Sequence, residues 1–68
     1  MMKDVGMAIM LKRKELGITI QQLSDKTGIS ITTLSQIENG KRTRKPQFYT
    51  LYKIADALEM DVNELIGK

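Results

Sequence analysis

The chain has 68 residues and a formal net charge of +3, and it contains neither cysteine nor histidine. A chain this short buries one modest core, so we expect residues 1–68 to form a single domain. The missing residue types exclude disulfides, the usual zinc sites, thiol nucleophiles and the commonest general base. We therefore expect no metal, no cofactor and no enzymatic activity.

The distribution of charge and apolar residues limits the compartment and the partner. No apolar run approaches the ~20 residues that a membrane span needs, and Asp4 lies where a signal peptide would be basic. Both features favour a cytoplasmic protein. Residues 1–45 carry nine Lys/Arg against four Asp/Glu, whereas residues 46–68 carry two against four. The first part of the chain therefore suits a polyanion.

The first predicted helix begins near Asp4 and ends at Gly17. Three residues are expected to point inward, and the stretch 12–15 is expected to lie largely outward; the inward set is Val5, Ile9 and Leu16. The same region has more apolar residues than one buried stripe needs, namely Met2, Met7, Met10 and Leu11. They indicate either extra core or a patch that contacts a partner.

Residues 19–40 predict two short helices joined by a tight turn. Thr19 and Gln22 form a capping-box pattern at the start of the first helix. That helix ends at Thr27 and Gly28, where a glycine can adopt the left-handed conformation of a sharp turn. Ser30 is the expected N-cap of the second helix.

The apolar spacing in this stretch predicts how the two helices join. Four side chains are expected to form the joint between them, namely Leu23, Ile29, Leu34 and Ile37. Ser24 lies where the helices come closest, so its small side chain permits the crossing. The remaining outer face of the second helix is short and mostly uncharged, which suits hydrogen bonding to base edges; it comprises Ile31, Thr32, Thr33, Ser35, Gln36 and Asn39.

A basic run and two further helices follow. Residues 41–45 read KRTRK, and the flanking Gly40 and Pro46 indicate a loop that either contacts phosphates or is simply solvated. The next helix is predicted from about residue 47 to residue 58, with one apolar face made by Phe48, Leu51, Ile54, Ala55 and Leu58. Its two tyrosines, Tyr49 and Tyr52, are expected at the surface rather than as stacking platforms. Asp61 and Glu64 should cap a short final helix.

These spacings resemble a known family. The order Leu23, small Ser24, Gly28, Leu34 and Ile37, followed by residues 38–40 (ENG), is similar to the helix-turn-helix of the Cro and phage-repressor family, also called XRE. The likeness extends from residue 9 to residue 65. It implies an all-α, lambda-repressor-like bundle of five short helices, with helices 2 and 3 forming the motif. It also implies sequence-specific binding of double-stranded DNA by a transcriptional regulator, with repression the expected mode.

The resemblance assigns expected roles to individual residues. Helix 30–39 would lie in the major groove, where the expected base contacts are Ile31, Thr32, Thr33, Ser35 and Gln36. The expected contacts to the DNA backbone are Thr19, Gln21, Asn39, Lys41, Arg42, Arg44 and Lys45. Arg13 would pair with Glu38 and so tie the first helix to the third. The chain departs from the family in a longer basic loop and in Ile20, where the family often has a glutamine.

Family members commonly bind near-palindromic operators as two-fold dimers, with half-sites ~34 Å apart. If this chain forms a weak homodimer, the expected surface lies near Tyr52, Met60 and the last helix. An antitoxin or another protein-interaction module is the alternative function, favoured by the methionine-rich first helix. A DNA-coating protein is disfavoured by the modest charge. An enzyme is disfavoured because the carboxylates have no catalytic neighbours; these are Asp25, Glu38, Asp56 and Glu64.

Overall fold

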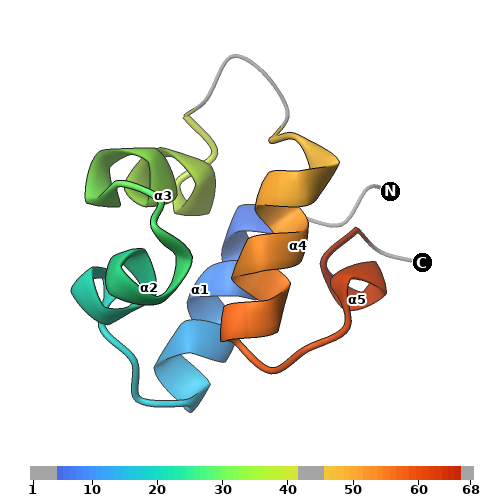
Figure 1. The fold of residues 1–68 in the computed structure, drawn as a ribbon, viewed down its shortest axis with the longest axis horizontal. Coiled ribbons are helices and arrows are strands. Elements are labelled where there is room, and N and C mark those ends of the chain that lie inside the picture. The colour runs from blue at the N-terminus through green and yellow to red at the C-terminus, as the bar shows by residue number, and fades with distance from the viewer. Residues whose placement is uncertain (1–4, 42–45, 67–68) are drawn as a thin grey trace.

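The computed structural model describes residues 5–41 and 46–66, and these residues form five α-helices with no strand among them. The helices are α1 (Val5–Glu15), α2 (Ile20–Thr27), α3 (Ile31–Glu38), α4 (Phe48–Ala57) and α5 (Val62–Ile66). In Figure 1, α4 is drawn in front of α1 in the middle of the view, with α2 and α3 on one side and α5 on the other. The predicted all-α bundle of five short helices is confirmed.

The core lies where these helices meet. Helix α1 packs on α3 and α5, α2 packs on α3 and α4, and α4 also packs on α5. Nine aliphatic side chains are buried there, namely Ile9, Leu23, Leu34, Ile37, Leu51, Ile54, Ala55, Leu58 and Leu65. Each fully buried leucine or isoleucine stabilises the fold by roughly 1.5–3 kcal/mol relative to an exposed one. Both helices of the predicted motif contribute to this core, which fixes their relative position.

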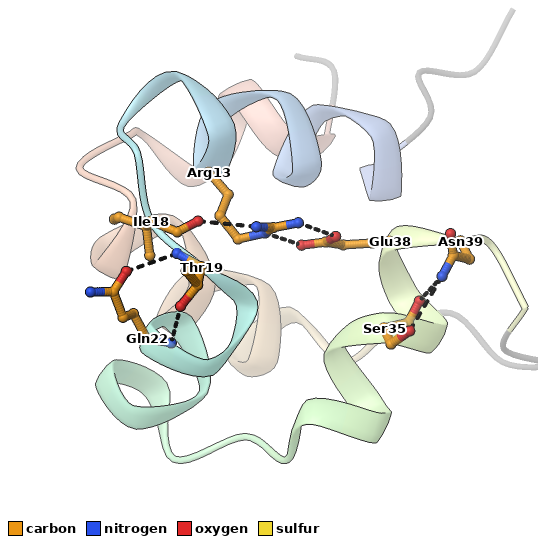
Figure 2. A network of polar contacts seen from close by, with 7 residues as sticks. All are labelled: Arg13, Ile18, Thr19, Gln22, Ser35, Glu38 and Asn39. Carbon is orange, nitrogen blue, oxygen red and sulfur yellow. Dashed lines mark hydrogen bonds and ion pairs between the residues drawn. The ribbon is translucent and has the colours of Figure 1, made fainter.

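Three helix starts carry the predicted capping residues, and those of α2 and α5 have reciprocal caps. The Thr19 Oγ1 accepts a hydrogen bond from the Gln22 N–H at 3.0 Å, and the Thr19 N–H donates to the Gln22 Oε1 at 2.8 Å (Figure 2). At α5, the Asp61 Oδ1 accepts from the Asn63 N–H at 2.8 Å and the Asp61 N–H donates to the Glu64 Oε1 at 2.9 Å. Both caps satisfy backbone donors that have no partner inside the helix.

Two apolar residues predicted to be buried are exposed. Leu16 is 38% exposed because α1 ends at Glu15, and Leu16 lies in the turn that leaves the helix. Phe48 is 62% exposed, although its helical phase matches that of Ala55. It is the first residue of α4 and extends past the buried part of that helix, which begins at Leu51. The period of an apolar pattern shows which side of a helix a residue faces, but it does not show how far along the helix the core extends.

Helices α1 and α3 approach each other so closely that only a glycine fits at position 6. Gly6 is a buried residue of α1. A Cβ atom added to it would lie 2.7 Å from the carbonyl oxygen of Glu38 and still closer to that of Ile37. Both neighbours are backbone atoms, so neither can rotate away. The sequence pattern did not identify this contact, which positions the end of α3 against α1.

Candidate nucleic-acid interface

The turn between α2 and α3 is held by backbone and side-chain hydrogen bonds. Gly28 adopts a φ of 76°, and its N–H donates to the carbonyl oxygen of Ser24 at 2.8 Å. The Ser24 hydroxyl donates to the carbonyl oxygen of Ile29 at 2.6 Å. The sequence analysis expected the small side chain of Ser24 to permit close packing of the two helices, and the structure adds this hydrogen bond. Leu23 and Leu34 are fully buried beside the turn, as expected for the joint.

The start of α3 is capped by Ser30. Its Oγ accepts from the Thr33 N–H at 3.1 Å and donates to the Thr33 Oγ1 at 3.0 Å. Thr33 is half-buried, and both its N–H and its hydroxyl are hydrogen-bonded to Ser30. Three of the other expected base contacts are exposed, namely Ile31, Thr32 and Gln36. The side chains of Thr32 and Gln36 form no hydrogen bond to another described residue, so their donors and acceptors remain available.

At the other end of α3, Asn39 is tied to the helix that precedes it. Its Nδ2 donates to the Ser35 carbonyl oxygen at 2.9 Å and lies 3.3 Å from the Ser35 Oγ (Figure 2). A phosphate oxygen would need this same amide donor. Asn39 therefore acts as a cap for the end of α3, and Ser35 is half-buried beneath it. The spacing of four residues was the sequence signal for this pair.

The start of α2 offers one hydroxyl and one amide. The Thr19 hydroxyl accepts from Gln22, so its own proton can still be donated to a ligand. The Gln21 Nε2 instead donates to the Asp25 Oδ1 at 3.1 Å. The carboxylate beside Gln21 opposes the approach of a phosphate. Ile20 packs partly against the core, which accounts for an apolar residue at this position.

Of the basic loop, the described residues include only Lys41. This lysine is exposed, and its N–H donates to the carbonyl oxygen of Gln36 at 2.9 Å. The bond fixes the start of the loop directly after α3. The other expected phosphate ligands of this loop, Arg42, Arg44 and Lys45, lie outside the described residues.

Arg13 and Glu38 form a bidentate ion pair between α1 and the last residue of α3. The Arg13 Nε donates to the Glu38 Oε2 at 2.8 Å, and its Nη2 donates to the Oε1 at 3.0 Å. The third nitrogen, Nη1, donates to the Ile18 carbonyl oxygen at 3.0 Å (Figure 2). The side chains of the pair are only 12% and 5% exposed. The hydrogen bond to Glu38 raises the pKa of Arg13, with burial acting in the opposite direction.

The part of the chain that the structure describes shows neither a metal-binding cluster nor a membrane span. No group of three or more acidic, histidine or cysteine side chains lies together within residues 5–41 and 46–66. None of the five helices is long and apolar enough to cross a bilayer. The described residues present an exposed, hydrogen-bonding face on α3, held in place by a buried joint and an ion pair.

A helix–turn–helix pair with an exposed second helix defines the class of this protein. The sequence profile of the helix-turn-helix family matches residues 9–65, and the chain belongs to this family. It is 40% identical over 57 residues to the cryptic phage CTXphi transcriptional repressor RstR of Vibrio cholerae. It is 36% identical over 67 residues to the transcriptional repressor RghR of Bacillus subtilis. The two matches cover 84% and 98% of this chain, but only 49% of each relative, so the chain spans about half their length.

Two solved structures share the fold. One is a crystal structure of SinR, described as the master regulator for biofilm formation, in complex with DNA. It has a TM-score of 0.84 and 33% identity, and the match covers 90% of this chain and 95% of that one. The other is a complex of SinR with SinI, with a TM-score of 0.86 and 31% identity, covering 94% of this chain and 61% of that one. The predicted resemblance to the Cro and phage-repressor family is confirmed.

Proposed function

We propose that this chain binds double-stranded DNA sequence-specifically within a transcriptional regulator, and that its mode of regulation is repression. The observation that carries the proposal is the outer face of α3, where the exposed side chains of Thr32 and Gln36 have no hydrogen-bond partner among the described residues. Repressors among its relatives and the complex of SinR with DNA support it. The proposal assigns no catalytic step to the chain and places it in the cytoplasm, with the DNA that it would bind.

In the proposed complex, α3 lies in the major groove, which presents a distinct pattern of donors and acceptors for each base pair. The Gln36 amide can bind adenine through two hydrogen bonds, and the Thr32 hydroxyl can donate or accept. Ile31, at 39% exposure, can pack on a thymine methyl. Thr33 and Ser35 are weaker candidates, because both are half-buried and already hydrogen-bonded.

The proposed contacts to the DNA backbone flank this helix. The Thr19 hydroxyl would donate to a phosphate on one side, and the basic loop would contact phosphates on the other, through Lys41, Arg42, Arg44 and Lys45. The Gln21 amide keeps one N–H for a phosphate but has the Asp25 carboxylate beside it, and the Asn39 amide would have to give up a contact to Ser35. We therefore rank these two below the others.

One such unit covers half of a symmetric site. We propose that two copies form a weak homodimer on a near-palindromic operator, with half-sites one helical turn, ~34 Å, apart. Selection of bound sequences from a random duplex library tests the function and the symmetry together. The expected result is one enriched near-palindromic sequence. Equal recovery of all sequences would refute specific recognition.

A protein-interaction role, such as that of an antitoxin, is the second candidate. It is favoured by α1, where Met7 is 50% and Leu11 is 58% exposed. The complex of SinR with SinI shows that a protein of the same fold binds a protein partner. Purification from native lysate without DNA distinguishes the two roles, because only this candidate predicts a stoichiometric protein partner. Such a partner would be lost in a Leu11→Ser variant that still binds DNA.

Replacing Gln36 by alanine should weaken binding to the preferred site by ~1–3 kcal/mol, with little change on random DNA. The loss is specific because a base-edge contact is made only with the correct base. Titration of the two duplexes by fluorescence anisotropy measures both affinities. Asn63→Ala removes an exposed amide from α5 and serves as the control. Equal losses on both duplexes would remove Gln36 from the set of residues that read bases.

Neutralising Arg42 and Arg44 together, by substitution with glutamine, should weaken binding to every sequence. Each phosphate contact releases about one counterion, so the slope of log K against log salt should fall by about two. Affinity measured at four or five salt concentrations gives this slope. Lys14→Gln, an exposed lysine of α1, should leave it unchanged. If the doubly substituted variant has the same salt slope as the original chain, these two arginines do not contact the DNA backbone.

A further inference from the structure

The aromatic residues of this protein lie at its surface rather than in its core. The chain has two tyrosines, one phenylalanine and no tryptophan. All three are in α4 and more than half exposed, with Phe48 at 62%, Tyr49 at 68% and Tyr52 at 51%. Aromatic side chains bury large areas and are enriched in protein–protein interfaces. The two tyrosines, three residues apart on the same side of α4, therefore indicate a surface that becomes covered.

A hollow lies beside these rings, between α4 and the last turn of α2. Its volume is about 390 Å³, and the residues lining it are Lys26, Thr27, Tyr49, Tyr52, Lys53, Asp56, Ala57 and Glu59. It lies at the opposite end of α2 from Thr19, the expected phosphate contact. It is also lined by two carboxylates, which disfavour a nucleic acid as the occupant. The hollow is therefore separate from the proposed DNA contacts.

The charges of this face are balanced and ordered along α4. Two lysines and two carboxylates line the hollow, so the face is neutral in a chain whose net charge is +3. Tyr49, Lys53 and Asp56 follow each other at spacings of four and three residues, on one stripe of the helix. The Lys53 Nζ lies over the Tyr49 ring, 5.5 Å from its centroid. Lys53 thus precedes Asp56 along the helix.

This order makes the face complementary to itself, and we propose that it is the surface through which two copies of the chain pair. In an antiparallel pairing of α4 with α4 of a second copy, Lys53 of each copy faces Asp56 of the other. Tyr52 of each copy then points toward Ala57 of the other, where the small side chain leaves room in the hollow. A two-fold axis repeats every contact, as an isologous interface requires.

The inference rests on the proposed function, because it assigns a surface to the homodimer proposed there. A face of about two helical turns is at the low end of interface size, so the pairing is weak without DNA. A small anionic ligand in the hollow is the alternative occupant. It is disfavoured because Asp56 and Glu59 line the same space.

Sedimentation equilibrium of the full chain, with two charge-reversed variants, tests the pairing. In a dimer of the Lys53→Glu variant, two acidic side chains would face each other at each of the two equivalent contacts. In a dimer of the Asp56→Lys variant, two basic side chains would do so. Each variant alone should therefore dimerise about tenfold more weakly, or not at all. An equimolar mixture of the two variants restores opposite charges at both contacts and should dimerise like the original chain. Lys14→Glu makes the same charge change on α1 and should have no effect.

Circular dichroism establishes that each variant is folded, so a loss of pairing is not a loss of structure. A mixture that stays as monomeric as its two components would overturn the inference, as would an original chain that is monomeric at every concentration. Binding to a duplex with a single half-site is measured with the same proteins. If all of them bind it specifically, the proposed function stands whatever the pairing result. If the original chain does not, the function itself has failed.

Discussion

Replacing Gly6 by alanine is expected to destabilise the protein by about 3 kcal/mol or more. The added Cβ would lie against the backbone carbonyl groups of Ile37 and Glu38, which cannot move without shifting α3 relative to α1. Overpacking in a core typically costs 1–3 kcal/mol, and a clash with backbone is at the upper end or beyond. A domain of this length has a total stability of only about 3–10 kcal/mol. Urea denaturation, followed by circular dichroism, measures the change.

The sign of this change separates steric contact from helix propensity. At a helix interior position without neighbours, Gly→Ala should stabilise by about 1 kcal/mol. At Gly17, where φ is +72° and an added Cβ would have no atom within 4 Å, alanine should cost only about 1 kcal/mol of backbone strain. A Gly6→Ala variant that is as stable as the original chain, or more so, would show that α1 and α3 are not in this contact.

Many of the features that were predicted correctly from sequence are local ones. The cap of α2 depends on Thr19 and Gln22, and that of α5 on Asp61 and Glu64, in each case three residues apart. Such signals are complete within one turn of helix, so the pattern contains all the information needed. The predicted joint between α2 and α3 succeeded for the same reason, because helical spacing sets which apolar side chains share a face.

The features that could not be predicted depend on distant parts of the chain. The contact of Gly6 joins residues more than 30 positions apart, and a glycine within an apolar helical pattern does not identify what approaches it. Phe48 was predicted in the core because its phase is correct, but the extent of the core depends on the neighbouring helices. The hollow beside Tyr52 likewise requires two helices to be placed together. By contrast, the hydrogen bond between Gln21 and Asp25 was accessible from their spacing of four.

Replacing Arg13 by alanine is expected to cost about 3 kcal/mol or more, because Glu38 would remain as a buried carboxylate without its partner. The variant also loses the hydrogen bond to the Ile18 carbonyl oxygen. The raised pKa keeps the guanidinium of Arg13 charged at every accessible pH. The stability that the charged form contributes would be lost only above that pKa. Substitution is therefore the test rather than titration. Thermal unfolding without DNA should show a clearly lower midpoint.

A double-mutant cycle distinguishes the ion pair from the packing of the arginine stem. Arg13→Met retains much of the stem and Glu38→Met removes the carboxylate, so each alone leaves one buried group without a partner. The two together leave neither, and the double variant should lose less stability than the sum of the single losses. Arg13→Lys should be intermediate, because an ammonium cannot form the two parallel hydrogen bonds. Additive losses would mean that the two side chains do not interact, and that α3 is fixed by its apolar contacts alone.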